Sequence, residues 1–316
     1  MKTIKISLVY ILSTLFFNSI QSQSQIIEEE ILLKNDSVQL PGTLSYNKTL
    51  ESQPLVIFIH GSGNVDRNGN QAGINAKANY IKQLSTLLNN ENIAFYRYDK
   101  RTSTVSNMKF IMRELSFDKF VEDAKLTINN FKDDSRFSSI TLIGHSQGSL
   151  VGMLSSVTGV DKYISLAGPS AAFDVIITKQ IRLQNGDSIA NIVESHFEEL
   201  KTTGTIAKVD LNLMSMFNKP TQPFLVSWAA YNPSEEIKKV IVPTLIINGT
   251  KDLQVSVEDA KQLKQSKDDA ELVIIENMNH VLKTIINDED NLKSYNSPNF
   301  PLSEKLVSTI TAFIKK

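Results

Sequence analysis

The chain has 316 residues, of which 41% are apolar and 21% are charged, and this is the composition of a folded protein with a sizeable core. Its formal net charge of -1 argues against binding to nucleic acid or to an anionic membrane surface, so a small-molecule or peptide substrate is favoured. The sequence contains no cysteine, which excludes disulfides, thiolate metal sites and a cysteine nucleophile.

Residues 1–24 have the pattern of a secretory signal peptide. Lys2 and Lys5 give a basic start, an apolar stretch follows, and the segment ends in small polar residues. The alternative is an uncleaved membrane anchor, but the apolar stretch is interrupted and falls short of the ~20 residues that span a bilayer. We therefore predict cleavage between Ile20 and Gln25 and an exported protein, periplasmic or extracellular in a bacterium, with no membrane association after cleavage.

Eight apolar runs after this leader predict strands. The runs are residues 26–34, 38–46, 55–59, 93–98, 140–143, 163–167, 244–248 and 272–275. The first two flank a short turn and are expected to form an antiparallel hairpin. Amphipathic segments such as Tyr80–Asn90 and Phe117–Phe131 separate later runs, which is typical of parallel strands joined by helices. The expected fold is α/β, with an eight-stranded, mostly parallel sheet, helices on both faces and a last helix at about 303–314.

The alternation of strands and helices stops in residues 169–240. Apolar residues recur there at helical spacing, at Ile189, Ile192, Val193, Phe197 and Leu200. We interpret this segment as a helical cap over the carboxyl edge of the sheet, inserted between core segments 25–168 and 241–316. An insertion that only packs against the core is the alternative.

The most demanding local pattern is Gly144-His145-Ser146-Gln147-Gly148. It follows the apolar run 140–143 and precedes a helix-like stretch at 149–158. A G-x-S-x-G segment between a strand and a helix places the serine in a strained turn, where glycines avoid collisions. Ser146 is therefore the candidate nucleophile.

An acylating serine needs a base and a carboxylate that orients the base. The sequence offers four histidines, His60, His145, His196 and His280. Only His280 fits the chain order of serine, acid and histidine that a strand-turn-helix nucleophile requires. His145 is expected to point away from Ser146. His196 is expected to pack inside the cap, or alternatively to touch substrate.

Asp252 is the preferred orienting carboxylate. It follows a predicted strand by one short turn, so it reaches the sheet edge where His280 also arrives. Glu276 is the close competitor.

Two backbone N–H groups are expected to stabilise the oxyanion of a tetrahedral intermediate. One belongs to Gln147, at the start of the helix after the nucleophile, and the other to Ser62, in the glycine loop 60–63. An ordinary turn is the alternative for that loop. Neither metal-binding nor phosphate-binding spacing occurs, so no metal and no cofactor are expected.

Further motifs occur in a recognisable order around these residues. They are His60-Gly61-Ser62-Gly63, Asp66-Arg67, Arg97-Tyr98-Asp99-Lys100-Arg101, the Ser146 pentapeptide, Leu166-Ala167-Gly168-Pro169, Tyr231-Asn232-Pro233, residues 248–255 and Asn279-His280. Over roughly residues 38–285 the chain thereby resembles the α/β-hydrolase superfamily, and within it bacterial esterases grouped with serine aminopeptidase-like proteins. The resemblance implies a carboxylester hydrolase with a triad of Ser146, Asp252 and His280 and a helical cap. The chain departs from the pattern at Thr102 and Ser149, where glycine is usual.

The leading hypothesis is a secreted serine hydrolase that cleaves small-molecule carboxylic esters through an acyl-enzyme on Ser146. Aromatic residues of the cap, Phe217, Phe224 and Trp228, favour a modest hydrophobic acyl pocket. The alternatives are a serine peptidase acting on short peptides and a catalytically silent binding protein with the same fold.

The charged residues of the motifs have two interpretations. Asp66, Arg67, Asp99 and Arg101 are expected to form ion pairs that fix the loops around the oxyanion site. Asp99 and Arg101 could instead set specificity by pairing with a charged group of the substrate.

Overall fold

The computed structural model describes residues 25–73, 77–156 and 159–316. The predicted signal peptide, residues 1–24, lies outside the described residues, as do the last two residues of the helix expected at 149–158.

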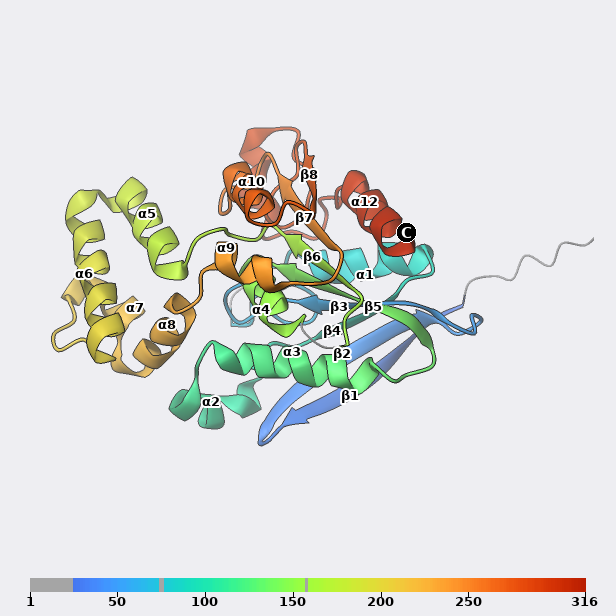
Figure 1. The fold of residues 1–316 in the computed structure, drawn as a ribbon, viewed down its shortest axis with the longest axis horizontal. Helices are drawn as coiled ribbons and strands as arrows, with labels where there is room; N and C mark the ends of the chain where they lie inside the picture. Colours follow the sequence, from blue (N-terminus) through green and yellow to red (C-terminus); the bar gives the residue numbers. More distant parts are fainter. Residues whose placement is uncertain (1–24, 74–76, 157–158) are drawn as a thin grey trace, which may run out of the picture.

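An eight-stranded sheet runs through the centre of the molecule (Figure 1). Its strands are β1 (Ile26–Asn35), β2 (Val38–Asn47), β3 (Gln53–Ile59), β4 (Ala94–Tyr98), β5 (Phe137–His145), β6 (Lys162–Leu166), β7 (Thr244–Gly249) and β8 (Glu271–Ile275). The order across the sheet is β1-β2-β4-β3-β5-β6-β7-β8. The β1–β2 and β2–β4 pairs are antiparallel, and all other pairs are parallel. All eight predicted strands are confirmed, with small shifts at their ends.

The α-helices in chain order are α1 (Tyr80–Asn90), α2 (Met108–Glu114), α3 (Asp118–Phe131), α4 (Gln147–Ser155), α5 (Phe173–Asn185), α6 (Asp187–Thr203), α7 (Met214–Phe217), α8 (Gln222–Ala229), α9 (Pro233–Glu236), α10 (Val257–Ser266), α11 (Asn291–Ser294) and α12 (Glu304–Lys315). Helices α3, α4 and α10 cover one face of the sheet, and α1 and α12 cover the other. Short 3₁₀ helices are η1 (Val105–Asn107), η2 (Leu211–Leu213), η3 (Lys219–Thr221), η4 (Ile237–Lys239) and η5 (Asp288–Asp290). No helix in the described ranges is both long and apolar enough to cross a membrane.

Two hydrophobic cores lie on the two faces of the sheet. Side chains alternate between the faces along each strand, so that Leu55 and Ile57 of β3 join the core under α3, α4 and α10. Val56 and Phe58 of the same strand join the core under α1 and α12. This packing fixes the carboxyl ends of the parallel strands, where the turns after β5 and β7 begin.

Residues 169–240, all of which are described, contain α5 to α9 and no strand. In Figure 1, α5 to α8 gather at the left, beside the sheet. This group, called the α5–α8 group below, has its own core, which includes Val193, Phe197 and Phe217. Pro220 and Pro223 lie at the starts of η3 and α8, where a helix does not use the missing N–H of proline.

Candidate active site

Ser146 lies in the turn between β5 and α4, with backbone angles φ 55° and ψ −121°. Residues other than glycine rarely adopt positive φ angles, so the turn is strained. The strain is possible because two glycines leave room. A Cβ on Gly144 would lie 2.3 Å from the carbonyl oxygen of Gly148, and a Cβ on Gly148 would lie 2.3 Å from that of Ile59. The turn brings Ser146 to the wall of two cavities.

Asp252 and His280 are in contact. His280 Nδ1 and Asp252 Oδ2 are 2.9 Å apart, and only 1% of the Asp252 side chain is exposed. The other carboxylate oxygen accepts hydrogen bonds from the backbone N–H groups of Gln254 (2.8 Å) and Val255 (2.9 Å). The carboxylate is thereby fixed as an acceptor, so His280 Nδ1 carries a proton, and in the neutral ring the lone pair is on Nε2. Glu276 is exposed and forms no hydrogen bond to His280 in the described structure.

Side chains of helix α11 form hydrogen bonds to both loops that carry Asp252 and His280. Asn279 Nδ2 donates to Asn291 Oδ1 (2.9 Å) and to Ser294 Oγ (2.7 Å). Asn291 Nδ2 in turn donates to the carbonyl oxygen of Lys251 (2.8 Å). Sequence reasoning missed Asn291 and Ser294, because they belong to no motif and only the fold brings them to the site.

The other three histidines are buried and have structural partners. His145 Nε2 lies 2.8 Å from the carbonyl oxygen of His280, and His60 Nε2 contacts the carbonyl oxygen of Tyr98. His196 Nε2 accepts a hydrogen bond from the backbone N–H of Asp210 (3.1 Å). Burial lowers the pKa of His60 to about 3 and that of His145 well below its usual value, so both rings are neutral. His196 packs inside the α5–α8 group, as the sequence favours.

Ser62 and Gln147 line the same cavity as Ser146. Neither of their N–H groups donates a hydrogen bond to another of the residues that the structure describes. Gln147 begins α4, so its N–H is one of the unpaired donors at the helix start. Gly61 lies so close that a Cβ on it would be 3.1 Å from Ser146 Cβ. The glycine loop is therefore adjacent to the candidate nucleophile. This position favours the oxyanion-site interpretation over that of an ordinary turn.

Known proteins share parts of this sequence. A family model described as serine aminopeptidase, S33, matches residues 71–215, a range that includes Ser146 and ends before Asp252 and His280. Esterase EstD of Thermotoga maritima is 23% identical over 248 residues, which are 77% of this chain and 58% of EstD. The chain thus spans little more than half the length of that relative.

Solved structures match most of the chain. The esterase Pf2001 of Pyrococcus furiosus is 18% identical with a TM-score of 0.58, over 92% of this chain and 91% of that one. Est1E from Butyrivibrio proteoclasticus, solved with ferulic acid bound, is 17% identical with a TM-score of 0.56, over 90% and 96%. This chain has the α/β-hydrolase fold. The predicted fold class and the predicted resemblance to this superfamily are both confirmed.

Two cavities meet at Ser146. The first, of about 280 Å³, also contains His280 and has polar lining residues, among them Gln71, Tyr80, Tyr295 and Asn296. The second, of about 370 Å³, lies against α5 and α8 and is mostly apolar, with Leu150, Phe173, Ile176, Ile177 and Trp228 in its lining. Within the described residues, neither lining includes an aspartate, glutamate, lysine or arginine.

Of the three aromatic residues predicted to form an acyl pocket, one lines the second cavity and two lie elsewhere. Trp228 lines the second cavity, and its ring stacks on that of Phe173 with centroids 3.6 Å apart. Phe217 is buried inside the α5–α8 group, and Phe224 packs edge-on against Phe120. Phe173 was not predicted, because helical spacing does not show which apolar residues of these helices face the cavity at Ser146 and which face the core of the helix group.

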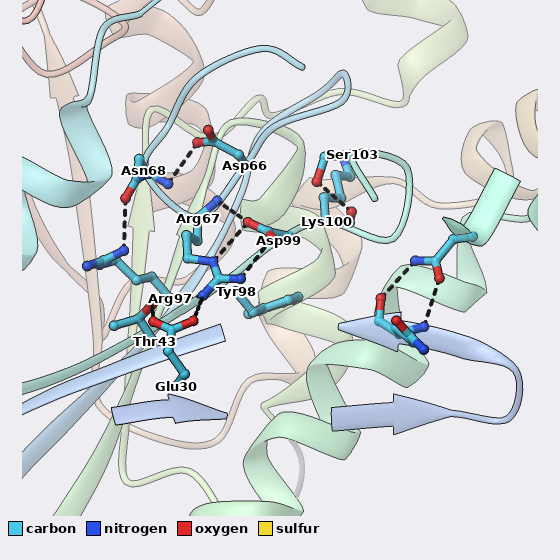
Figure 2. A network of polar contacts seen from close by, with 12 residues as sticks. Glu30, Thr43, Asp66, Arg67, Asn68, Arg97, Tyr98, Asp99, Lys100 and Ser103 are labelled. Atoms are coloured by element: carbon cyan, nitrogen blue, oxygen red, sulfur yellow. Dashed lines mark hydrogen bonds and ion pairs between the residues drawn. The ribbon is translucent and has the colours of Figure 1, made fainter. Parts of the chain in front are cut away.

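The charged motif residues contact other protein groups: Arg67, Asp99 and Arg101 form ion pairs, whereas Asp66 accepts hydrogen bonds. Figure 2 shows the Arg67 guanidinium against the Asp99 carboxylate, with contacts of 3.0 and 3.1 Å. Arg101 pairs with Asp123 at 2.6 Å, and both side chains are buried. Asp66 accepts hydrogen bonds from backbone N–H groups of its own loop. None of the four motif residues is among those that line the two cavities at Ser146.

Both departures from the usual α/β-hydrolase pattern are accommodated. The buried Ser149 hydroxyl lies 2.9 Å from the Tyr163 hydroxyl and 2.8 Å from the Ser165 hydroxyl. The loop that begins at Thr102 continues into η1, where Asn107 Nδ2 donates to the carbonyl oxygen of Arg101 (3.1 Å). Hydrogen bonds therefore stabilise both places where glycine is absent.

Proposed function

We propose that this protein is a serine hydrolase that cleaves carboxylic esters of small molecules. The observation that carries the proposal is the 2.9 Å contact between His280 Nδ1 and Asp252, with His280 and Ser146 on the wall of one cavity. Two similar proteins, EstD and Pf2001, are esterases by name, and a third, Est1E, has been solved with ferulic acid bound. These names support an ester substrate.

The proposed reaction begins with attack of Ser146 Oγ on the ester carbonyl carbon, while His280 Nε2 takes the hydroxyl proton. Asp252 holds the proton on Nδ1 and stabilises the imidazolium that forms. The N–H groups of Ser62 and Gln147 donate to the oxyanion of the tetrahedral intermediate. His280 then protonates the leaving alcohol, and water repeats the sequence on the acyl-enzyme to release the acid and restore Ser146.

The linings of the two cavities favour a neutral ester over a peptide. We assign the acyl group to the cavity beside Trp228, which lies against α5 and α8, and the alcohol to the cavity that contains His280. An exopeptidase needs a fixed charge that holds a peptide terminus, and neither lining offers a carboxylate among the described residues.

The description of the matching family model supports a second candidate, a serine aminopeptidase. Comparing the hydrolysis of an aminoacyl arylamide with that of the matched ester separates the two functions. Faster turnover of the arylamide would replace the esterase proposal.

A serine variant tests the nucleophile. Ser146→Ala is expected to abolish both the hydrolysis of short p-nitrophenyl esters and the labelling by a fluorophosphonate probe. Ser308→Ala, an exposed serine on α12, is the matched control and should keep both. Unchanged activity of folded Ser146→Ala would overturn the assignment. A folded wild-type protein that resists the probe would favour the silent binding protein.

Export is a separate proposal that rests on residues 1–24. The basic, apolar and polar sections of this segment support removal by a signal peptidase. Expression of the full chain in a bacterium should yield a soluble product whose first residue lies between Gln21 and Gln25. Recovery of a chain that still begins at Met1 in the membrane fraction would contradict export by cleavage.

A further inference from the structure

Lys100 is a buried lysine directly beneath the candidate oxyanion site. Only 6% of the residue is exposed. Its ammonium donates to the carbonyl oxygen of Gly61 (2.7 Å) and to Gln147 Oε1 (2.6 Å), and it lies 4.4 Å from the centroid of the Phe120 ring. Lys100 is absent from the linings of both cavities, so it reaches the site through other residues.

The first contact acts on the peptide group that carries one oxyanion donor. The Gly61 carbonyl and the Ser62 N–H belong to the same peptide group, which is trans, so the two bonds point in opposite directions. An ammonium fixed on the carbonyl side therefore holds the N–H on the side of the Ser146 cavity. The positive charge also polarises the peptide group and strengthens its N–H as a donor.

The second contact acts on the residue that carries the other donor. Lys100 holds the side chain of Gln147, whose backbone N–H is at the start of α4. One ammonium thus connects the two chain segments, after β3 and after β5, that must face the oxyanion together. A fixed distance between two donors is what oxyanion stabilisation requires.

We propose that Lys100 is a positioning residue that orients and polarises the two N–H donors of the oxyanion hole. The inference rests on the proposed serine hydrolase function.

The surroundings of Lys100 show that burying this lysine has a cost. Burial lowers its pKa to about 7, and the Asp123 carboxylate on α3 offsets only part of that effect. Asp123 is itself paired with Arg101, and the nearby His60 ring is neutral. An apolar side chain of similar length would fill this space without the desolvation cost, so packing alone does not explain a lysine here.

Lys100→Met removes the ammonium and keeps an unbranched apolar chain. We expect kcat for p-nitrophenyl acetate to fall roughly 10- to 100-fold with little change in KM, because the donors act mainly in the transition state. Lys162→Met is the matched control. The Lys162 ammonium also donates to two carbonyl oxygens, of Phe313 (3.0 Å) and Ile314 (2.7 Å). Lys162 is, however, the first residue of β6, whereas the candidate site lies where the parallel strands end. This control should keep its kcat.

A rescue separates the role of the ammonium from general damage. The chain has no cysteine, so Lys100→Cys creates a single thiol that can be alkylated in denaturant before refolding. Alkylation with 2-bromoethylamine restores an amine at the length of lysine and should recover most of the lost kcat. Alkylation with iodoacetamide leaves an uncharged amide and should not.

Two outcomes would overturn the inference. One is a folded Lys100→Met variant with wild-type kcat. The other is an aminoethylated Lys100→Cys variant that stays as slow as the iodoacetamide product, although wild-type protein refolded in the same way is active. A wild-type protein without esterase activity or fluorophosphonate labelling would instead overturn the proposed function, and this inference with it.

Discussion

The ring of His145 supports the backbone of His280. His145 Nε2 lies 2.8 Å from the carbonyl oxygen of His280, and the two ring centroids are 4.8 Å apart. Burial, together with the nearby His280, lowers the pKa of His145 well below its usual value, so the neutral ring donates through its Nε2–H. The residue next to the candidate nucleophile in sequence therefore holds the candidate base in space.

This contact predicts different outcomes for two variants of His145. His145→Leu leaves the buried carbonyl of His280 without a donor, which should lower the free energy of unfolding by about 1–3 kcal/mol. Displacement of the base should also lower kcat by about tenfold. His145→Gln keeps an N–H donor and should lose less of both. Urea denaturation and p-nitrophenyl acetate kinetics measure the two effects, and a His145→Leu variant with full stability and full kcat would contradict the prediction.

The contact of Asp252 with His280 predicts a large effect of Asp252→Asn. The amide no longer holds the proton on His280 Nδ1, so kcat should fall by up to ~10⁴ while the fold is kept. Single-turnover kinetics with a p-nitrophenyl ester measure the loss. Glu276→Gln is the control, since Glu276 is exposed and has no hydrogen bond to His280 in the described structure, and it should keep its activity. Near-normal turnover of Asp252→Asn would mean that another carboxylate orients the base.

The sequence could predict those parts of the site that depend on local pattern or on strand order. Ser146 follows from glycine spacing between a strand and a helix. Asp252 and His280 follow because neighbouring parallel strands end at one edge of the sheet, which brings their following loops together. Their contact therefore follows from the order and direction of the strands that precede them.

Other parts of the site depend on packing between distant segments. Lys100 was visible only as a member of a motif, because its two acceptors, Gly61 and Gln147, lie 39 and 47 residues away along the chain. Phe173 was missed because the periodicity of α5 indicates an apolar face without showing what it covers. Asn291 lies on a four-residue helix with no periodic pattern. Such contacts depend on three-dimensional packing and cannot be predicted from the local sequence.

The apolar cavity predicts a change in acyl-chain preference. Ile177→Trp should fill part of the cavity of about 370 Å³ beside Trp228. Each excluded methylene group loses about 0.8 kcal/mol of transfer free energy, so kcat/KM for an octanoate ester should fall roughly 10- to 100-fold. The acetate ester should be little affected. Leu183→Trp, at an exposed position of the same helix, is the control, and equal losses on both esters would place the acyl group elsewhere.

The buried ammonium of Lys100 predicts how stability depends on pH. Its pKa is about 7 in the folded protein, against an ordinary value of 10.5, because burial disfavours the charged form. Between these two values the unfolded chain binds more protons at this residue than the folded chain, so the free energy of unfolding rises with pH in this window. For one group shifted this far, the increase from pH 7 to pH 9 is roughly 2 kcal/mol.

Lys100→Met removes this dependence, so the wild-type free energy of unfolding should increase relative to that of the variant as pH rises from 7 to 9. The comparison cancels the contribution of Lys283, whose pKa burial lowers to about 8, because the variant keeps this residue. Urea denaturation at a series of pH values measures the difference. A difference between the two proteins that stays constant with pH would mean that Lys100 keeps an ordinary pKa. The positive charge would then persist under the oxyanion site at every pH at which the enzyme works.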